Sequence, residues 1–343
     1  MAASIYAWVY EDPFHSIYRA STATISVLSN GLLLYIIFTT ASSAGIGSYR
    51  YLLAVFAVCD VVTSFAHAFL QPLVHLTDTG LYFFSHHSQI IIGGKSFATV
   101  FCLIFIATYY QTFLSLAYHF VFRLTTVTSG IARSCTSQWS TAHWTILAVV
   151  VNILYVARFM GVCLLAFTPS DATRSMAPPE MLELYGVDLR DSNSGFAVIS
   201  QPDPTSGQMI VHARSVIALI LLLSLFLGTG LVIVYCIWRI SGVIRSADND
   251  FTTRTRKMQT DLFHAILIQV DFPVLFSYLP LATILLFPVV SGIPLGAFGN
   301  VLFSITAISP CVDAFFVLFF IGRFRLAVIR LFRLPFDHHV SST

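Results

Sequence analysis

The amino-acid sequence predicts an all-α membrane protein, a bundle of seven transmembrane helices. Long apolar stretches alternate with short charged segments; 57% of the 343 residues are hydrophobic and only 10% are charged. An average soluble protein carries about 25% charged residues. A helix needs roughly 20 mainly apolar residues to cross the hydrocarbon core of a bilayer. The chain contains seven stretches of this kind.

Each apolar stretch is expected to be helical, because backbone N–H and C=O groups cannot remain unpaired in lipid. The stretches do not alternate as barrel strands do. The predicted helices cover residues 17–40, 50–76, 97–122, 142–167, 212–239, 261–287 and 295–321. Together with a short amphipathic helix at 322–334 they form one domain, residues 1–335, and a short cytoplasmic tail follows at 336–343.

The first predicted helix is expected to act as an uncleaved targeting signal. Residues 1–14 lack the basic segment that opens a signal peptide, and they carry Glu11 and Asp12. Basic residues bracket the third, fourth and fifth helices, and Arg158 lies inside the fourth.

Polar residues form a stripe along one face of the second predicted helix. Its members follow helical spacing and are Asp60, Ser64, His67, Gln71 and His75. Polar groups inside a membrane usually face the protein interior. For Ser64 and His67, a packed seam between helices is the preferred interpretation. For Gln71 and His75, a seam and a ligand-facing role have equal weight.

Pro273 and Pro280 are expected to kink the sixth predicted helix, because proline has no N–H to donate. Asp271 lies near the middle of this helix, where an unpartnered carboxylate is expensive. One interpretation is that Asp271 faces a cavity, bonded to Tyr109, Asn300 or water, and favours a ligand with a hydrogen-bond donor or a positive charge. A plain interhelical hydrogen bond has equal weight.

The segment after the seventh helix alternates apolar and basic residues. Phe324, Val328, Leu331 and Phe332 recur at helical spacing, which predicts an amphipathic helix on the inner leaflet. A basic stop-transfer patch is the alternative.

The distribution of basic residues predicts an extracellular N-terminus and a cytoplasmic C-terminus. In this orientation the inner segments hold most of the 18 lysines and arginines. The long segment 168–211 is then extracellular, and it either caps a cavity between the helices or is a mobile surface excursion.

The sequence contains no catalytic constellation, phosphate-binding loop or metal motif, so no enzyme activity, cofactor or metal is expected. Nucleic-acid binding is not expected either, because no basic run is interleaved with aromatic residues. Cys102 and Cys163 fall in the outer halves of their helices, where two inert thiols are favoured over a disulfide.

Several segments resemble the nematode Str-type serpentine chemoreceptors. The matching motifs are GSYRYLLAVFAVCD (47–60), HFVFR (119–123), RKMQTDLFHAILIQVDFPVLFSYLP (256–280) and SPCVDAFF (309–316). The resemblance implies a G-protein-coupled seven-helix receptor that binds a small-molecule ligand and activates a heterotrimeric G protein. It also implies the plasma membrane of a sensory-neuron cilium as the location.

The same resemblance implies roles for individual residues. The implied ligand site, in the outer half of the bundle, comprises Gln71, His75, Phe105, Tyr109, Arg158, Asp271, Phe276, Tyr278 and Asn300. The implied polar core comprises Asn30, Asp60, Ser309 and Asp313. The implied coupling residues are Arg123, Arg245, Arg254, Arg256 and Lys257. His119 and Arg123 replace the usual acidic-Arg-aromatic triplet of such receptors, so an ionic lock to an adjacent acid is absent.

Two other classes of membrane protein are alternatives. A ligand-gated channel resembling insect odorant receptors would place the N-terminus inside, against the distribution of basic residues. A small transporter would show an internal repeat or broken helices in corresponding halves, and the sequence shows neither.

Overall fold

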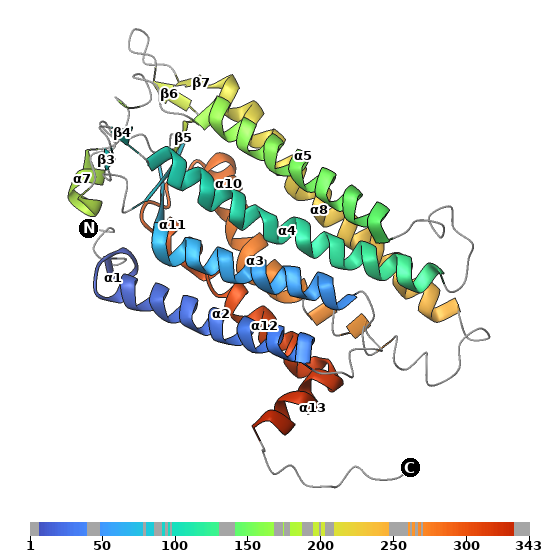
Figure 1. Cartoon of the computed structure of the whole chain (residues 1–343). Helices are drawn as coiled ribbons and strands as arrows, with labels where there is room; N and C mark the ends of the chain where they lie inside the picture. The colour runs from blue at the N-terminus through green and yellow to red at the C-terminus, as the bar shows by residue number, and fades with distance from the viewer. Residues whose placement is uncertain are drawn as a thin grey trace, which may run out of the picture.

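The computed structural model describes residues 7–39, 49–77, 80–85, 91–92, 95–96, 98–129, 141–167, 174, 179–186, 195–198, 200–202, 209–246, 260, 263–264, 267–268 and 270–332. Within these residues, long helices form a bundle that short strands and a short helix cover at one end (Figure 1). The N-terminus lies at this capped end, and α13 lies at the opposite end.

Among the described residues, seven membrane-length segments form the bundle. They are α2 (Phe14–Thr39), α3 (Tyr49–Leu70), α4 (Ala98–Ser129), α5 (Thr141–Phe167), α8 (Ala213–Ser246), η4 with α10 (Val274–Tyr278 and Leu279–Ser291), and α11 with α12 (Phe298–Thr306 and Ser309–Phe320). Six of the segments are long and apolar enough to cross a membrane. The remaining one, α4, has 32 residues and packs against α3, α5 and α8. The predicted seven-helix bundle is confirmed.

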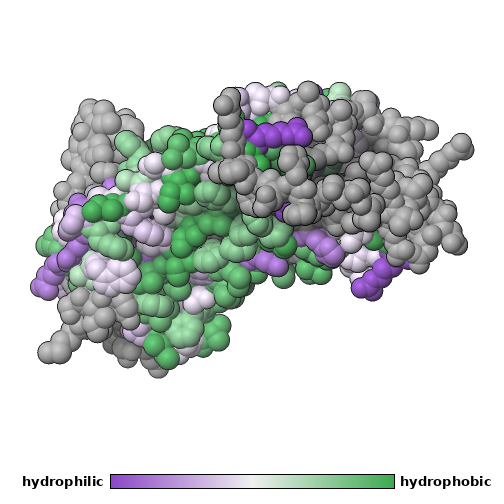
Figure 2. Space-filling model, turned by 90° about the horizontal axis from the view of Figure 1, so that it is seen from below, coloured by the Kyte–Doolittle hydropathy of each residue, from purple (hydrophilic) through white to green (hydrophobic). Residues whose placement is uncertain are grey.

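Many large apolar side chains face outward, as lipid contact requires. Leu154 and Leu165 of α5, Leu227 of α8 and Phe319 of α12 are all more than half exposed. Figure 2 shows hydrophobic side chains gathered across the middle of one face, with hydrophilic ones nearer its ends. The chain is a multi-pass membrane protein.

The second helix ends earlier than predicted. α3 stops at Leu70, and Pro72–Leu76 form strand β1. Proline has no N–H to donate and disfavours helical geometry in the residue before it. That residue, Gln71, has a left-handed φ of 44°. The prediction of a helix over 50–76 was wrong, and the polar stripe on α3 ends at His67.

An antiparallel three-stranded sheet covers the capped end. β1 pairs with β2 (Gly80–Ser85), and β2 pairs with β5 (Gly195–Val198) from the long segment between α5 and α8. In this register His75 lies opposite Tyr82. Two smaller hairpins lie at the same end, β3–β4 (Ile91–Ile92 and Lys95–Ser96) and β6–β7 (Ser200–Pro202 and Met209–Val211).

A small apolar core joins this sheet to α1 (Ala7–Tyr10) and α7 (Glu180–Tyr185). Its buried side chains are Tyr10, Leu73, Tyr82, Phe84, Met181, Tyr185 and Ala297. The described parts of segment 168–211 therefore fit the interpretation of a cap on the bundle.

The start of α11 lies directly against β1. Gly296 and Leu76 exchange backbone hydrogen bonds of 2.7 and 3.2 Å, and the Asn300 side-chain oxygen accepts a 2.8 Å hydrogen bond from the Val74 N–H. A Cβ atom at Gly299 would lie 2.9 Å from the Val74 carbonyl oxygen. Glycine is required at 299 because the two backbones approach so closely.

Gly299→Ala is expected to lower the free energy of unfolding by about 1–3 kcal/mol, since the added methyl group must push α11 away from β1. The thermal unfolding midpoint of the purified chain in detergent measures the change. Gly228→Ala in α8 is the matched control, because its Cβ would meet nothing within 4 Å. An equal loss of stability at both positions would contradict the packing explanation.

The sixth helix contains a π-helical turn, η4. The Leu279 N–H donates to the carbonyl of Val274, five residues earlier, and Pro273 and Pro280 flank the turn. Pro280 has no N–H to donate to a carbonyl group of the preceding turn. The turn is one residue wider than an α-helical turn, and this wider geometry tolerates the absence of that hydrogen bond. The two prolines predicted to kink this helix thus flank a π-helix.

The seventh helix is also interrupted. α11 ends at Thr306 and α12 begins at Ser309, immediately before Pro310, which again has no N–H. Beyond α12 the chain forms α13 (Gly322–Leu331). Its Phe324 is buried in the core at that end of the bundle. The predicted C-terminal helix is present but ends at Leu331, short of residue 334.

Candidate functional site

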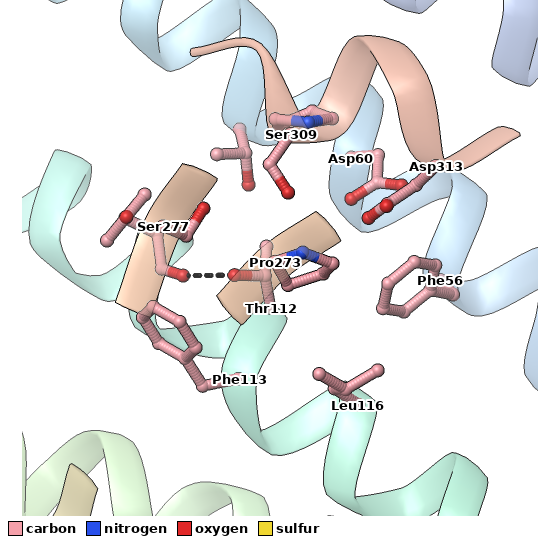
Figure 3. Close-up of a pocket in the computed structure, with 12 residues that line it drawn as sticks. Phe56, Asp60, Thr112, Phe113, Leu116, Pro273, Ser277, Ser309 and Asp313 are labelled. Atoms are coloured by element: carbon pink, nitrogen blue, oxygen red, sulfur yellow. Dashed lines mark hydrogen bonds between the residues drawn. The ribbon is translucent and has the colours of Figure 1, made fainter. Parts of the chain in front are cut away.

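A small polar cavity lies where the two interrupted helices face α3 and α4 (Figure 3). Its open centre is about 10 Å³, room for one water-sized occupant. The lining residues are Phe56, Asp60, Thr63, Tyr109, Thr112, Phe113, Leu116, Pro273, Ser277, Ser309, Pro310 and Asp313. Pro273 and Ser277 belong to the π-helical break, and Ser309 and Pro310 begin α12. Both interrupted helices therefore contribute their irregular turns to one cavity.

Two carboxyl groups meet in this cavity. Asp60 of α3 and Asp313 of α12 are 1% and 3% exposed, and their side chains lie next to each other in Figure 3. One oxygen of each has no hydrogen-bond partner among the described residues. Like charges in a low-dielectric site disfavour joint ionisation. The pair is therefore suited to hold a proton or a cation between its members.

The four residues of the predicted polar core are all buried in this region: Asn30, Asp60, Ser309 and Asp313. Asn30 of α2 donates hydrogen bonds to the carbonyl oxygens of Ser26 and Pro310, at 3.0 and 3.1 Å. This residue ties α2 to the first turn of α12, beside the cavity.

An aromatic cluster around His67 lies between the cavity and the cap. The His67 ring packs against Phe105, Tyr109 and Phe303, with centroids 4.6, 6.1 and 5.6 Å away. Its Nε2 lies 3.5 Å from the Thr306 hydroxyl, and its buried Nδ1 has no hydrogen-bond partner in the described part of the chain. Tyr109 also lines the polar cavity, so it connects the cluster to the cavity.

A buried arginine marks the point where α3 ends. Arg19 of α2 is 3% exposed and donates hydrogen bonds to the carbonyl oxygens of His67 and Pro72, at 2.9 and 2.8 Å. Carbonyl groups at the end of a helix lack intrahelical partners, and a cation there is favourable. Arg19 therefore stabilises the change from α3 to β1.

The hydroxyl group of Tyr185 connects the cap to the bundle. It accepts a 2.9 Å hydrogen bond from the side-chain amide of Asn300 on α11, and it shares a 3.0 Å hydrogen bond with Nδ1 of His75 on β1. The Tyr185 ring packs against Tyr10 and Phe84, with centroids 4.8 and 5.0 Å away. One side chain thus joins α7, β1 and α11.

Tyr185→Phe is expected to loosen the cap, because ring packing survives while Asn300 and His75 each lose a hydrogen bond, a loss of about 1–3 kcal/mol. Amide hydrogen exchange in segments 72–76 and 180–185, followed by mass spectrometry, should become faster. Tyr235→Phe is the control, since Tyr235 is an exposed tyrosine on α8. Unchanged exchange in Tyr185→Phe would show that the hydroxyl does not hold the cap.

Most of the predicted ligand residues lie within the bundle or beneath the cap. The ones near the aromatic cluster or the cap are His75, Phe105, Tyr109, Tyr278 and Asn300. Tyr278 packs between Phe113 and Phe226, with centroids 4.1 and 4.5 Å away. Gln71 and Phe276 are half-buried, at the turn after α3 and on η4.

Arg158 and Asp271 are both exposed and do not line this cavity, so Asp271 does not face it as one interpretation expected. Arg158 is exposed on α5 and donates a 3.0 Å hydrogen bond to the Ser224 hydroxyl of α8. Asp271 is exposed, whereas Pro273 faces the interior of the bundle. Two residues are separated by about 200° around an α-helix, so the two side chains point to opposite sides.

The predicted coupling residues are described only in part. Arg123, near the α13 end of α4, is 7% exposed, and Arg245 is exposed in the last turn of α8. Arg254, Arg256 and Lys257 lie outside the described residues. Cys102 and Cys163 are both free thiols.

Three residues that organise the site were not predicted from the sequence. Ser277 had a signal, because it lies one helical turn after Pro273 and so shares its face. For Arg19, the sequence indicated only a basic residue in the first turn of a predicted helix. Tyr185 had no local signal, since its partners lie 110 and 115 residues away.

The chain matches the family described as "Serpentine type 7TM GPCR chemoreceptor Str" over residues 15–329. A Caenorhabditis elegans protein named "G-protein coupled receptor str-33" is 19% identical over 309 residues, covering 90% of this chain and 87% of the relative. A Caenorhabditis briggsae protein named "Serpentine receptor class r-10" is 21% identical over 310 residues, covering 87% and 85%.

Among solved structures, squid rhodopsin aligns with a TM-score of 0.61 and 13% identity, covering 98% of this chain and 89% of the rhodopsin chain. At this level of identity the likeness concerns the fold alone.

Proposed function

Because the chain belongs to the Str family of serpentine seven-transmembrane G-protein-coupled chemoreceptors, we propose that it binds a small molecule beneath its cap and activates a heterotrimeric G protein. The family and the fold make it a G-protein-coupled chemosensory receptor. The position of the ligand and the route of the signal through the bundle are proposed from the geometry of the site.

The aromatic cluster supports a ligand site in the capped half of the bundle. Small-molecule sites are mostly apolar, with a few polar groups that fix orientation. Phe105, Tyr109 and Phe303 supply the apolar surface, and Nδ1 of His67 supplies a buried polar atom that lacks a hydrogen-bond partner among the described residues. Asp271 is exposed, so it gives no support to the expectation of a ligand with a hydrogen-bond donor or a positive charge.

The main support for the proposal is that the aromatic cluster around His67 is in contact with the polar cavity. A ligand shifts an equilibrium only through its different affinity for two arrangements of the protein. Tyr109 contacts His67 in the cluster and also lines the cavity, where the π-helical turn and the first turn of α12 meet. A ligand that moves Tyr109 therefore acts on both interrupted helices.

The orientation proposed for the receptor places its capped end outside the cell. The distribution of basic residues supports this direction. Arg123 and Arg245 then lie at the cytoplasmic end, where the G protein binds, and α13 lies on the inner leaflet. By family resemblance the proposed location is the plasma membrane of a sensory cilium.

A screen of volatile and water-soluble small molecules tests this function in cells that express the chain, with cAMP and calcium as readouts. Labelling of an N-terminal epitope on intact cells tests the orientation. A response that requires a co-expressed Gα subunit supports the proposal. A ligand-evoked current that persists without G proteins would contradict it and favour a channel.

A further inference from the structure

Two charged side chains of opposite sign lie on the outer, lipid-facing surface of the described membrane spans. They are Arg158 of α5 and Asp271, which precedes η4 by three residues, and both are exposed. Charges within a membrane are costly, and they almost always face the protein interior or pair with one another. The charges of Asp60 and Asp313 follow this rule, since both residues are buried. Arg158 and Asp271 do not follow it within one copy of the chain.

Neither charge is neutralised by a described residue. Arg158 donates one 3.0 Å hydrogen bond to the hydroxyl of Ser224 on α8, and that hydroxyl donates its own proton to the Leu221 carbonyl. A guanidinium has five N–H donors, and in the described part of the chain none of them meets an acid. The carboxyl group of Asp271 has no hydrogen-bond or ion-pair partner among the described residues.

The two charges flank α8 from opposite sides. On one side α5 lies along α8, and the Arg158–Ser224 hydrogen bond joins them (Figure 1). On the other side is the sixth helix, whose Tyr278 ring packs against Phe226 of α8 with centroids 4.5 Å apart. The outward surface of α8 between these two contacts is apolar. Its side chains that are more than half exposed include Ile220, Leu227, Leu231, Val234 and Trp238.

The charges also lie in the same part of the membrane. Ser224, the partner of Arg158, is two residues from Phe226, which contacts Tyr278. Asp271 precedes Tyr278 by seven residues, roughly 10 Å along a helix toward the α13 end. The α5 helix begins at that end, and helical side chains lean toward the start of their helix, so the long Arg158 side chain shortens this distance. Lipid headgroups at the capped end lie in the opposite direction, beyond the last nine residues of α5, roughly 13 Å away.

We propose that two copies of the chain associate through α8, with Arg158 of each copy paired with Asp271 of the other. A two-fold axis along the membrane normal, beside α8, places the α5 side of one copy against the sixth helix of the other. Such an axis keeps every residue at its depth, so both ion pairs form at once. A contact of α5 with α5 is disfavoured, because it would bring two arginines together in a medium of low dielectric constant.

The association is separate from the function proposed above. Each copy keeps its own polar cavity and its own aromatic cluster, and neither Arg158 nor Asp271 lines the cavity. Ligand potency per receptor is therefore expected to stay unchanged when the contact between copies is lost.

Resonance energy transfer between two differently tagged copies, in cells at matched surface density, tests the contact. Arg158→Glu places like charges opposite each other in both pairs, so the apparent affinity between copies should fall about tenfold, the effect of two interhelical polar contacts. Asp271→Arg should weaken self-association to the same degree. Arg325→Glu is the matched control, because Arg325 is an exposed arginine on α13, outside the contact, and it should leave energy transfer unchanged.

Co-expression of the two charge-reversal variants gives the decisive result. A copy with Arg158→Glu opposite a copy with Asp271→Arg has opposite charges in both pairs, so energy transfer should return to the wild-type level. Misfolding of either variant would not be rescued in this way. Transfer in the mixed cells as low as with either variant alone would overturn the proposal, and so would wild-type transfer no higher than random collision gives. An anionic lipid or a different membrane protein beside Arg158 predicts one of these two results.

Ligand-evoked signalling in the same cells tests the proposed function independently. Energy transfer that follows the charges, without G-protein activation by any ligand, would contradict the receptor function and leave the association standing. Normal signalling with energy transfer that ignores the charges would overturn the association alone.

Discussion

Asp60→Ala is expected to reduce ligand-evoked signalling by about 5- to 150-fold, the usual range of coupling between two sites. Asp60 and Asp313 lie next to each other in the cavity to which the π-helical turn and α12 both contribute. Removing one carboxyl group leaves no pair to share a proton or a cation, so this one link between α3 and α12 is lost. Dose–response curves in expressing cells, with surface receptor quantified, measure the loss.

Asp271→Ala is the matched control for this change. It removes the same carboxyl group from a membrane-spanning helix, but from an exposed position that does not line the cavity. Asp313→Ala should reproduce the effect of Asp60→Ala, and the double variant should be no worse than either single one, because the pair acts as a unit. Normal potency in Asp60→Ala would show that the polar core only fills space.

Pro280→Ala is expected to weaken signalling to a similar degree, again about 5- to 150-fold. Alanine restores a backbone N–H that can donate to the preceding turn. The wider π-helical turn at 274–278 is then no longer needed, and a regular α-helical turn is expected to replace it. A regular α-helix would rotate Ser277, which now points into the cavity beside Thr112 (Figure 3). Signalling amplitude and potency, corrected for surface expression, are the measurements.

Pro288→Ala is the control for this prediction. Pro288 lies inside α10, in the same membrane-spanning segment, and does not line the cavity. A general effect of proline on helix stability predicts equal changes at both positions. Equal potency for the two variants would contradict a specific role of the π-helical turn.

Features set by apolar length and by local charge could be predicted from the sequence. The seven-helix bundle followed from long uncharged stretches, and the burial of Asp60 followed from the cost of polar groups in lipid. His67 fell on the predicted stripe of α3. These features depend on residues within one helix, so spacing alone was enough.

Features set by broken helical geometry were misjudged. Asp271 and Tyr278 are seven residues apart and would share a face on a regular α-helix. The π-helical turn between them adds a residue to that turn, and the shared face is lost. The expectation that His75 continues the stripe of α3 was wrong for a similar reason. The helix ends at Leu70, before Pro72, and His75 lies on strand β1.

The cap could not be derived because its contacts join distant segments. Tyr185 meets His75 and Asn300 across more than 100 residues, and Gly299 is required only because β1 passes close to α11. No periodicity or composition rule links these positions. Whether the long segment was a cap or a mobile excursion was therefore open until the packing of Met181 and Tyr185 was seen.

The most direct test of the central claim is nucleotide exchange on a purified heterotrimeric G protein by the purified receptor in lipid nanodiscs, with a ligand found in the screen. We predict that the ligand accelerates exchange with the wild-type receptor. We also predict that Asp60→Ala reduces this acceleration about 5- to 150-fold while ligand binding persists. Ligand binding without accelerated exchange in the wild type, for every Gα subunit tried, would contradict the claim.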